Sequence, residues 1–167
     1  IPIRAGKYVN ESVTGTSSNR ANPFFMIGRS STTEDYGECY GFNLIYSGNH
    51  YEAAQVNSYG KLRLVSGINP ATFSYIIEAG KCFEAPEAVL TYSYKGYNRM
   101  SHNMHEFVRK HIVRGIWRDK ERPVLINSWE AAYFNINERK LVKLAKAAKD
   151  TGVELFVMDD GWFGHRN

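Results

Sequence analysis

The sequence predicts an antiparallel β-sandwich followed by one β-α-β unit, and three observations support this fold class. Between Phe24 and Tyr94, short β-rich runs alternate with turn residues, and no helical periodicity separates them. A helical stripe follows, and a charged segment that ends at Pro123 separates it from the rest of the chain. After Pro123 the pattern is strand, helix, strand within roughly 35 residues, which is typical of two parallel strands joined by a crossover helix.

The first part of the chain predicts a series of short strands. Tyr40, Phe42 and Leu44 alternate with smaller or polar residues, which is the period of a strand. A hairpin turn is expected at Tyr59-Gly60. Strands are expected over residues 39–46, 61–65, 72–78 and 88–94. Short antiparallel strands of this kind favour a sandwich.

Helical signals begin near residue 101. We expect Ser101 to cap a helix that runs to Arg114 and ends at Gly115. The expected domains are therefore a sandwich over residues 1–100, a helix and linker over 101–122, and an α/β part over 123–167.

The α/β part is predicted in more detail. Residues 124–126 and 153–158 are apolar runs, as in strands buried on both faces. Asn135 and Glu138 have the spacing of a capping box, and Gly152 is expected to close the helix. One helical face is apolar and the opposite face is basic: Leu141, Leu144, Ala145 and Ala148 against Lys143, Lys146 and Lys149.

Composition excludes several classes of protein. The net charge is +4, but the 21 Lys and Arg residues are scattered, so we expect no nucleic-acid partner. Cys39 and Cys82 are far apart and predict two buried free thiols. His102 and His105 do not have the spacing of a zinc helix, so no metal site is expected. No stretch is apolar enough for a membrane span and no signal peptide is visible, so we expect a cytoplasmic protein without membrane contact.

Asp159-Asp160-Gly161-Trp162 directly follows the second apolar run of the α/β part. Carboxylates at the carboxyl end of a buried strand lie where α/β folds keep their ligand sites. Carboxylates accept hydrogen bonds from vicinal hydroxyls, and the faces of Trp162 and Phe163 suit the apolar side of a pyranose. The alternative is an ordinary strand-ending turn. Adjacent strand residues point to opposite faces, so Asp159 and Asp160 fit substrate binding better than the paired acids of a glycosidase.

Asn127-Ser128-Trp129-Glu130 ends the first strand of the same unit and shares its edge. Trp129 is a candidate wall of a sugar site, and Glu130 could bind substrate or support a neighbour. The alternative for this segment is a loop with a packing tryptophan.

These motifs resemble a known family. The segments Pro123–Phe134 and Leu155–Gly164 together resemble the family-36 α-galactosidases of bacteria and fungi. Three β-rich segments resemble that family's N-terminal sandwich: Thr33–Glu38, Tyr40–Asn49 and Gly67–Pro70. The resemblance covers most of the chain from Asn22 onwards.

The resemblance implies a β-supersandwich followed by a (β/α)₈ TIM barrel, whose first β-α-β unit would be residues 123–167. It implies retaining hydrolysis of terminal α-1,6-linked galactose from melibiose and raffinose, through a covalent galactosyl-enzyme and without cofactor or metal. Asp159 and Asp160 would bind galactose hydroxyls, and Trp129 would line the pocket. The full-length protein would be a homotetramer.

The family's nucleophile and acid/base lie on later barrel strands, and a complete barrel takes about 250 residues. We therefore expect a fragment with part of the galactose site, no catalytic residue before Asn167 and no activity of its own. One alternative is a non-catalytic carbohydrate-binding β-sandwich module, which would leave the β-α-β unit unexplained. Another is a related glycoside hydrolase or glycosyl transferase of the same clan.

Overall fold

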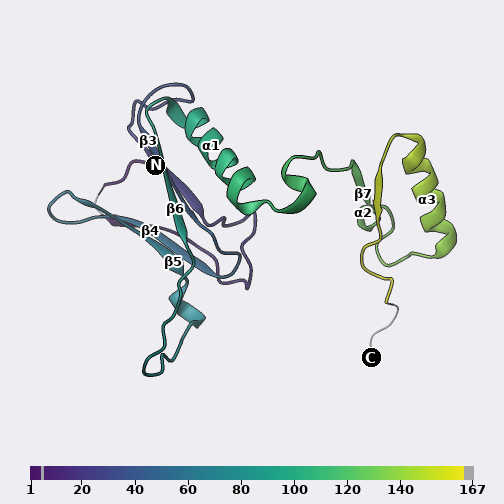
Figure 1. Ribbon diagram of the computed structural model, residues 1–167, viewed down its shortest axis with the longest axis horizontal. Helices are drawn as coiled ribbons and strands as arrows, with labels where there is room; N and C mark the ends of the chain where they lie inside the picture. The colour runs from purple at the N-terminus through teal and green to yellow at the C-terminus, as the bar shows by residue number, and fades with distance from the viewer. Residues whose placement is uncertain (5, 164–167) are drawn as a thin grey trace. The chain divides into compact units, whose positions relative to one another are not determined.

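A computed structural model of the chain describes residues 1–4 and 6–163, and it divides into two compact units, residues 1–110 and 111–167. The first unit holds two antiparallel sheets of three strands each (Figure 1). The second holds a parallel pair of strands and its crossover helix. The predicted antiparallel, sheet-rich character of the N-terminal part is confirmed.

The first sheet has the order β1-β4-β5, with β1 at Gly6–Glu11, β4 at His50–Val56 and β5 at Leu62–Ile68. The hairpin between β4 and β5 was predicted, and the Asn57 side chain closes it by accepting bonds from the backbone N–H groups of Tyr59 and Lys61. Strand β1 was not predicted. Its sequence is largely polar, which suits a strand at the edge of the described sheet, where it pairs with β4.

The second sheet has the order β2-β3-β6, with β2 at Phe24–Gly28, β3 at Cys39–Leu44 and β6 at Ala88–Ser93. The predicted strands over 39–46 and 88–94 are confirmed within two residues at their ends. Tyr40 and Phe42 of β3 share a pocket with Leu62 and Leu64 of β5, so the two sheets face each other.

Helix α1, at Gly96–Phe107, lies along β3 and β6 (Figure 1). Met100 and Met104 form a small core with Cys39, against which Phe24, Val89 and Tyr97 pack. The predicted start at Ser101 is wrong by five residues, because the left-handed backbone of Gly96 (φ +72°) lets the helix begin against the backbone of Glu34. Helical structure continues as a π-helical turn, Val108–Ile112, so it ends within two residues of the predicted Arg114, and Gly115 begins a short 3₁₀ turn, Gly115–Arg118.

The predicted strand over residues 72–78 is wrong. The chain forms a 3₁₀ turn at Pro70–Thr72 and then has no regular structure until β6. The rings of Phe73 and Tyr75 pack across this loop on Phe83, with centroid distances of 5.6 and 4.7 Å. Their apolar surface is therefore used inside the loop rather than in a sheet. Cys82 lies in the same loop and is exposed, so only Cys39 is the buried free thiol that was predicted.

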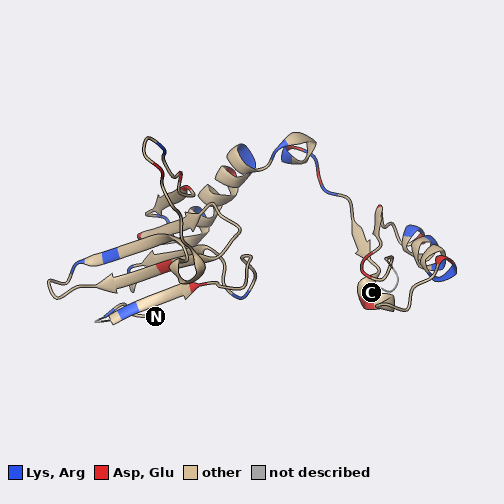
Figure 2. Ribbon diagram, turned by 90° about the horizontal axis from the view of Figure 1, so that it is seen from below, with Lys and Arg blue, Asp and Glu red and all other residues tan. Residues whose placement is uncertain are grey.

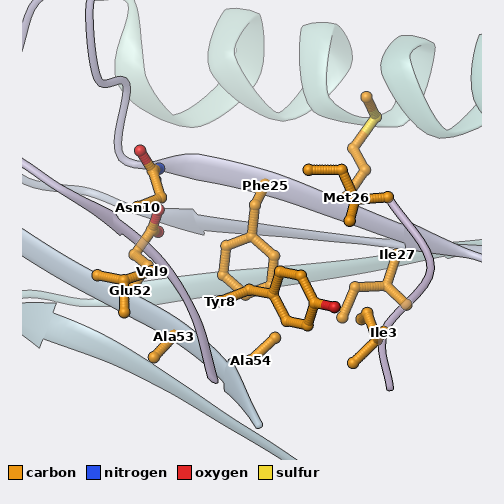
Figure 3. Close-up of a pocket in the computed structure, with 11 residues that line it drawn as sticks. Ile3, Tyr8, Val9, Asn10, Phe25, Met26, Ile27, Glu52, Ala53 and Ala54 are labelled. Carbon is orange, nitrogen blue, oxygen red and sulfur yellow. Dashed lines mark hydrogen bonds between the residues drawn. The ribbon is translucent and has the colours of Figure 1, made fainter. Parts of the chain in front are cut away.

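A pocket of about 280 Å³ lies between β1, β2 and β4 (Figure 3). Its wall is mainly apolar, but the fully buried carboxyl group of Glu52 belongs to it. Asn10 Nδ2 donates to Glu52 Oε2 at 2.8 Å, and Ser66 Oγ donates to Oε1 at 3.3 Å. Burial raises the pKa of Glu52, and the hydrogen bonds and the charge of His50 oppose this shift.

After residue 120, the elements of the second unit are, in chain order, β7 (Leu125–Asn127), α2 (Trp129–Ala132), α3 (Glu138–Asp150) and β8 (Leu155–Val157). Strands β7 and β8 are parallel, as predicted. The apolar face of α3 is at least partly buried and its lysines are exposed, also as predicted; Figure 2 shows the basic residues along this helix in blue.

Two details of this unit differ from the prediction. The N-cap of α3 is Asn137, whose side chain accepts from the backbone N–H of Lys140, while Asn135 binds the Lys140 ammonium group. The strands are not buried on both faces: Leu125 and Leu155 are 51% and 41% exposed. Within residues 111–163, α3 is the only helix long enough to cover a sheet face. Among the described residues, no helix combines the length and the apolar character needed to cross a membrane.

Candidate functional site

The carboxyl ends of β7 and β8 bring together two polar segments that are about 30 residues apart in sequence. The register pairs Asn127 with Val157, and the backbone N–H of Ser128 donates to the Val157 carbonyl at 3.0 Å. The residues that follow, Trp129 on one strand and Asp159 on the other, therefore leave the sheet at the same edge. The expectation that both motifs share an edge is fulfilled by this parallel register.

Asn127 connects the two segments through its side-chain amide. Its Nδ2 donates to Asp159 Oδ2 at 2.6 Å, and its Oδ1 accepts from the backbone N–H of Trp129 at 2.7 Å. The first of these is a charge-assisted hydrogen bond, the stronger class. One amide thus orients the Asp159 carboxylate and fixes the start of the helix that carries Trp129.

Ser128 supports Asp159 from the other side. Its hydroxyl, in a side chain only 1% exposed, accepts from the backbone N–H of Asp159 at 3.1 Å. Ser128 is also the N-cap of α2, but it makes no side-chain capping bond there. The hydroxyl is used to hold the strand end instead of the helix end.

The two aspartates differ in environment. Asp159 is partly buried, and its Oδ1 accepts from the backbone N–H of Asp160 at 2.8 Å. With the bond from Asn127, each carboxylate oxygen of Asp159 has one protein donor. Asp160 is exposed. The geometry therefore gives one carboxylate with a fixed orientation beside one that is open to solvent.

Trp129 is held by aromatic contacts at the end of α2. Its indole meets the ring of Tyr133 at 5.3 Å and the ring of Phe134 at 4.9 Å, both edge-to-face. The Tyr133 hydroxyl donates to Glu130 Oε2 at 3.1 Å, so Glu130 supports a neighbour in this structure.

Trp162 lies on the other side of the motif. Its ring contacts Phe163 edge-to-face at 5.5 Å and lines a groove with residues of α3, including Leu141 and Val142. Gly161, with φ +102°, packs its α-carbon against Ile136 so closely that a side chain would press on that residue. The structure thus joins Asp159 to Trp129 through Asn127, and it places Trp162 beside α3.

Sequence reasoning missed the roles of Asn127 and Ser128, although it singled out the segment that contains them. Both residues directly precede Trp129, which the sequence analysis made the candidate wall of the sugar site. The available signal was two short polar side chains directly after an apolar run, at a strand end where hydrogen-bonding groups need partners.

Comparison with known proteins identifies the family. Residues 82–167 match the melibiase family model, and residues 1–78 match the glycosyl hydrolase family 36 N-terminal domain. This chain belongs to glycosyl hydrolase family 36, the melibiases. The two matched regions meet near the loop that precedes β6.

Relatives in this family are named α-galactosidases. α-Galactosidase AgaA of Geobacillus stearothermophilus is 45% identical over 166 residues, which are 99% of this chain and 23% of AgaA. α-Galactosidase 1 of Pediococcus pentosaceus is 44% identical over 93% of this chain and 21% of its own length. The crystal structure of AgaA superposes on 99% of this chain with a TM-score of 0.92. The chain therefore spans less than a quarter of these relatives.

Proposed function

We propose that the complete protein is an α-galactosidase that releases terminal α-D-galactose from α-1,6-galactosides such as melibiose and raffinose. The family membership of this chain supports the reaction class. Crystal structures of AgaA variants in complex with raffinose and with stachyose support the substrate class. The single observation in this chain that carries the proposal is the oriented carboxylate of Asp159 beside Trp129 and the exposed Asp160.

Asp159 and Asp160 accept hydrogen bonds from galactose hydroxyls in this proposal. A charged acceptor binds a hydroxyl about twice as strongly as a neutral one. The bonds from Asn127 and Asp160 set the direction of the Asp159 lone pairs before substrate arrives, which reduces the cost of ordering them. Trp129 and Trp162 offer apolar walls to the sugar ring.

The remaining architecture is also a proposal. The β7-α3-β8 unit is the first β-α-β unit of a (β/α)₈ barrel, residues 1–100 are the end of a β-supersandwich, and residues 101–122 link the two. The nucleophile and acid/base of a retaining mechanism lie outside these 167 residues. The complete protein forms a homotetramer and acts in the cytoplasm.

The test is hydrolysis of a nitrophenyl α-galactoside and of raffinose by the complete protein. Asp160→Asn removes one charged acceptor and should lower kcat/KM by the equivalent of about 1.5–3 kcal/mol, with an unchanged melting temperature. Asp150→Asn, at the exposed end of α3, is the matched control and should retain wild-type kinetics. Wild-type kinetics for Asp160→Asn would remove this residue from the site, and no hydrolysis by the complete protein would refute the proposed activity.

The competing function is a non-catalytic carbohydrate-binding module in the sandwich. It is favoured by the half-exposed ring pair of Tyr40 and Tyr92, whose centroids are 5.1 Å apart. A protein lacking residues 120–167 that still binds galactose would support it. Loss of binding in that deletion, with retained binding in the complete protein, would reject it.

A further inference from the structure

Tyr133 has an unusual backbone conformation. Among the described residues it is the only non-glycine residue with a positive φ, at φ +47° and ψ −134°. Residues with a Cβ rarely occupy this region, and such strain persists only where the surrounding structure holds it. Strain of this kind also gathers at functional sites, so it requires an explanation in local contacts.

Tyr133 contacts Trp129 through both its backbone and its ring, and its hydroxyl donates to Glu130 Oε2. Its backbone N–H donates to the Trp129 carbonyl at 2.7 Å and so ends α2. Its ring meets the Trp129 indole at an interplanar angle of 76°, and the ring of the next residue, Phe134, meets the same indole at 89°. The reversal of the chain at Tyr133 therefore lets two consecutive aromatic residues contact a single indole.

Burial does not explain this arrangement. The Tyr133 side chain is 53% exposed and that of Phe134 is 66% exposed, whereas Trp129 itself is partly buried. The α-carbon of Phe134 lies close to Gly161 of the aspartate motif, since a Cβ placed on Gly161 would lie 3.4 Å from it. The strained turn therefore lies between Trp129 and the aspartate motif.

We propose that Tyr133 is a positioning residue that fixes the Trp129 indole as a wall for the apolar face of a galactosyl group. The left-handed turn presses the rings of Tyr133 and Phe134 against the indole, and this removes the freedom of Trp129 to swing into or away from the sugar. The inference rests on the proposed function, because it assigns Trp129 to the galactose site. Tyr133 acts through Trp129 and not on the reacting bond, so its effect falls on binding.

The first test is kinetic and uses the complete protein. Tyr133→Gly removes the ring and relaxes the backbone, so KM for a nitrophenyl α-galactoside should rise about tenfold, equal to about 1.4 kcal/mol, with kcat little changed. The melting temperature should not fall, because glycine adopts a positive φ without strain. Tyr133→Phe keeps the ring and should have wild-type KM. If the glycine variant does not fold, Tyr133→Asn takes its place, since asparagine also occurs at turn positions with a positive φ.

A matched control and a double-mutant cycle separate positioning from a structural role. Tyr59→Gly, in the exposed β4–β5 turn, should leave KM unchanged. In a Trp129→Ala background, Tyr133→Gly should have no further effect on KM, because residues that act through one another are not additive. Additive effects, or a lowered melting temperature with unchanged KM, would overturn the inference.

A spectroscopic test does not depend on activity. In the complete protein labelled with fluorotryptophan, the Trp129 resonance is assigned by its loss in Trp129→Phe. Tyr133→Gly should shift this resonance and leave those of Trp117 and Trp162 in place. An unmoved Trp129 resonance refutes the positioning role whatever the kinetics. A shifted resonance in a protein that hydrolyses no α-galactoside refutes the proposed function and leaves the positioning role intact.

Discussion

Asn127→Asp is the most informative single change at the candidate site, because it keeps the shape of the side chain and replaces one hydrogen bond with a repulsion. The amide nitrogen that donates to Asp159 at 2.6 Å becomes a carboxylate oxygen facing another carboxylate. Loss of the charge-assisted bond costs about 1.5 kcal/mol at this exposed position. Repulsion between two charges about 4 Å apart in water adds about 1 kcal/mol. The sum, about 2.5 kcal/mol, predicts a decrease in kcat/KM of roughly 70-fold.

The assay is kcat/KM of the complete protein on a nitrophenyl α-galactoside, together with the melting temperature. Asn137→Asp is the matched control, since Asn137 caps α3 and aspartate is an equally good N-cap. Equal kinetics for the two variants would refute the hydrogen-bond argument.

Three further predictions concern the rest of the chain. Burial raises the pKa of Glu52 above 4.5, so its carboxyl group binds a proton more tightly in the folded protein than in the unfolded chain. The contribution of Glu52 to the free energy of unfolding therefore falls as the pH rises from 4.5 through the raised pKa. Glu52→Gln should therefore raise the melting temperature at pH 8 but not at pH 4, and equal changes at both would contradict this. Gly96→Ala should lower the free energy of unfolding by at least about 2 kcal/mol. The new Cβ would collide with the Glu34 carbonyl, and alanine would also have to adopt a positive φ. Gly60→Ala shares the positive φ without the collision and should cost about half as much in a denaturant titration. The isolated 167-residue chain should show no galactosidase activity and should self-associate through the exposed apolar faces of β7 and β8, which activity assays and light scattering would check.

The position of the candidate site could be predicted from sequence because strand ends carry a clear signal. An apolar run followed at once by Asp159 marks the carboxyl end of β8, and the strand-helix-strand order marks the parallel pairing with β7. The role of Ser128 could not be predicted in this way. A serine before a helix predicts an N-cap, and only the register of β7 against β8 brings its hydroxyl to the Asp159 N–H.

The errors in the sandwich have a common physical cause. The side chains of residues 72–78 are of the types that favour strands. A strand also needs a neighbouring strand to pair with, and here the rings of Phe73 and Tyr75 pack on Phe83 instead. Strand β1 shows the reverse case, since a polar sequence becomes a strand because β4 offers an edge. The start of α1 was also decided by a distant contact, that of Gly96 with Glu34.

The parallel register of β7 and β8 has a consequence for how this region can vary. The two halves of the candidate site are aligned by three paired residues, from Leu125 with Leu155 to Asn127 with Val157, and not by the length of chain between them. The backbone N–H groups of the turn after α3, at Thr151–Gly152, donate to the carbonyls of Ala148 and Lys149 in α3, so we expect insertions there to leave the site aligned. A single residue inserted within β8 would instead move Asp159 out of reach of Asn127 and turn every following side chain to the opposite face. We therefore expect this unit to tolerate insertions between the two strands, whereas insertions within a strand should destroy the candidate site.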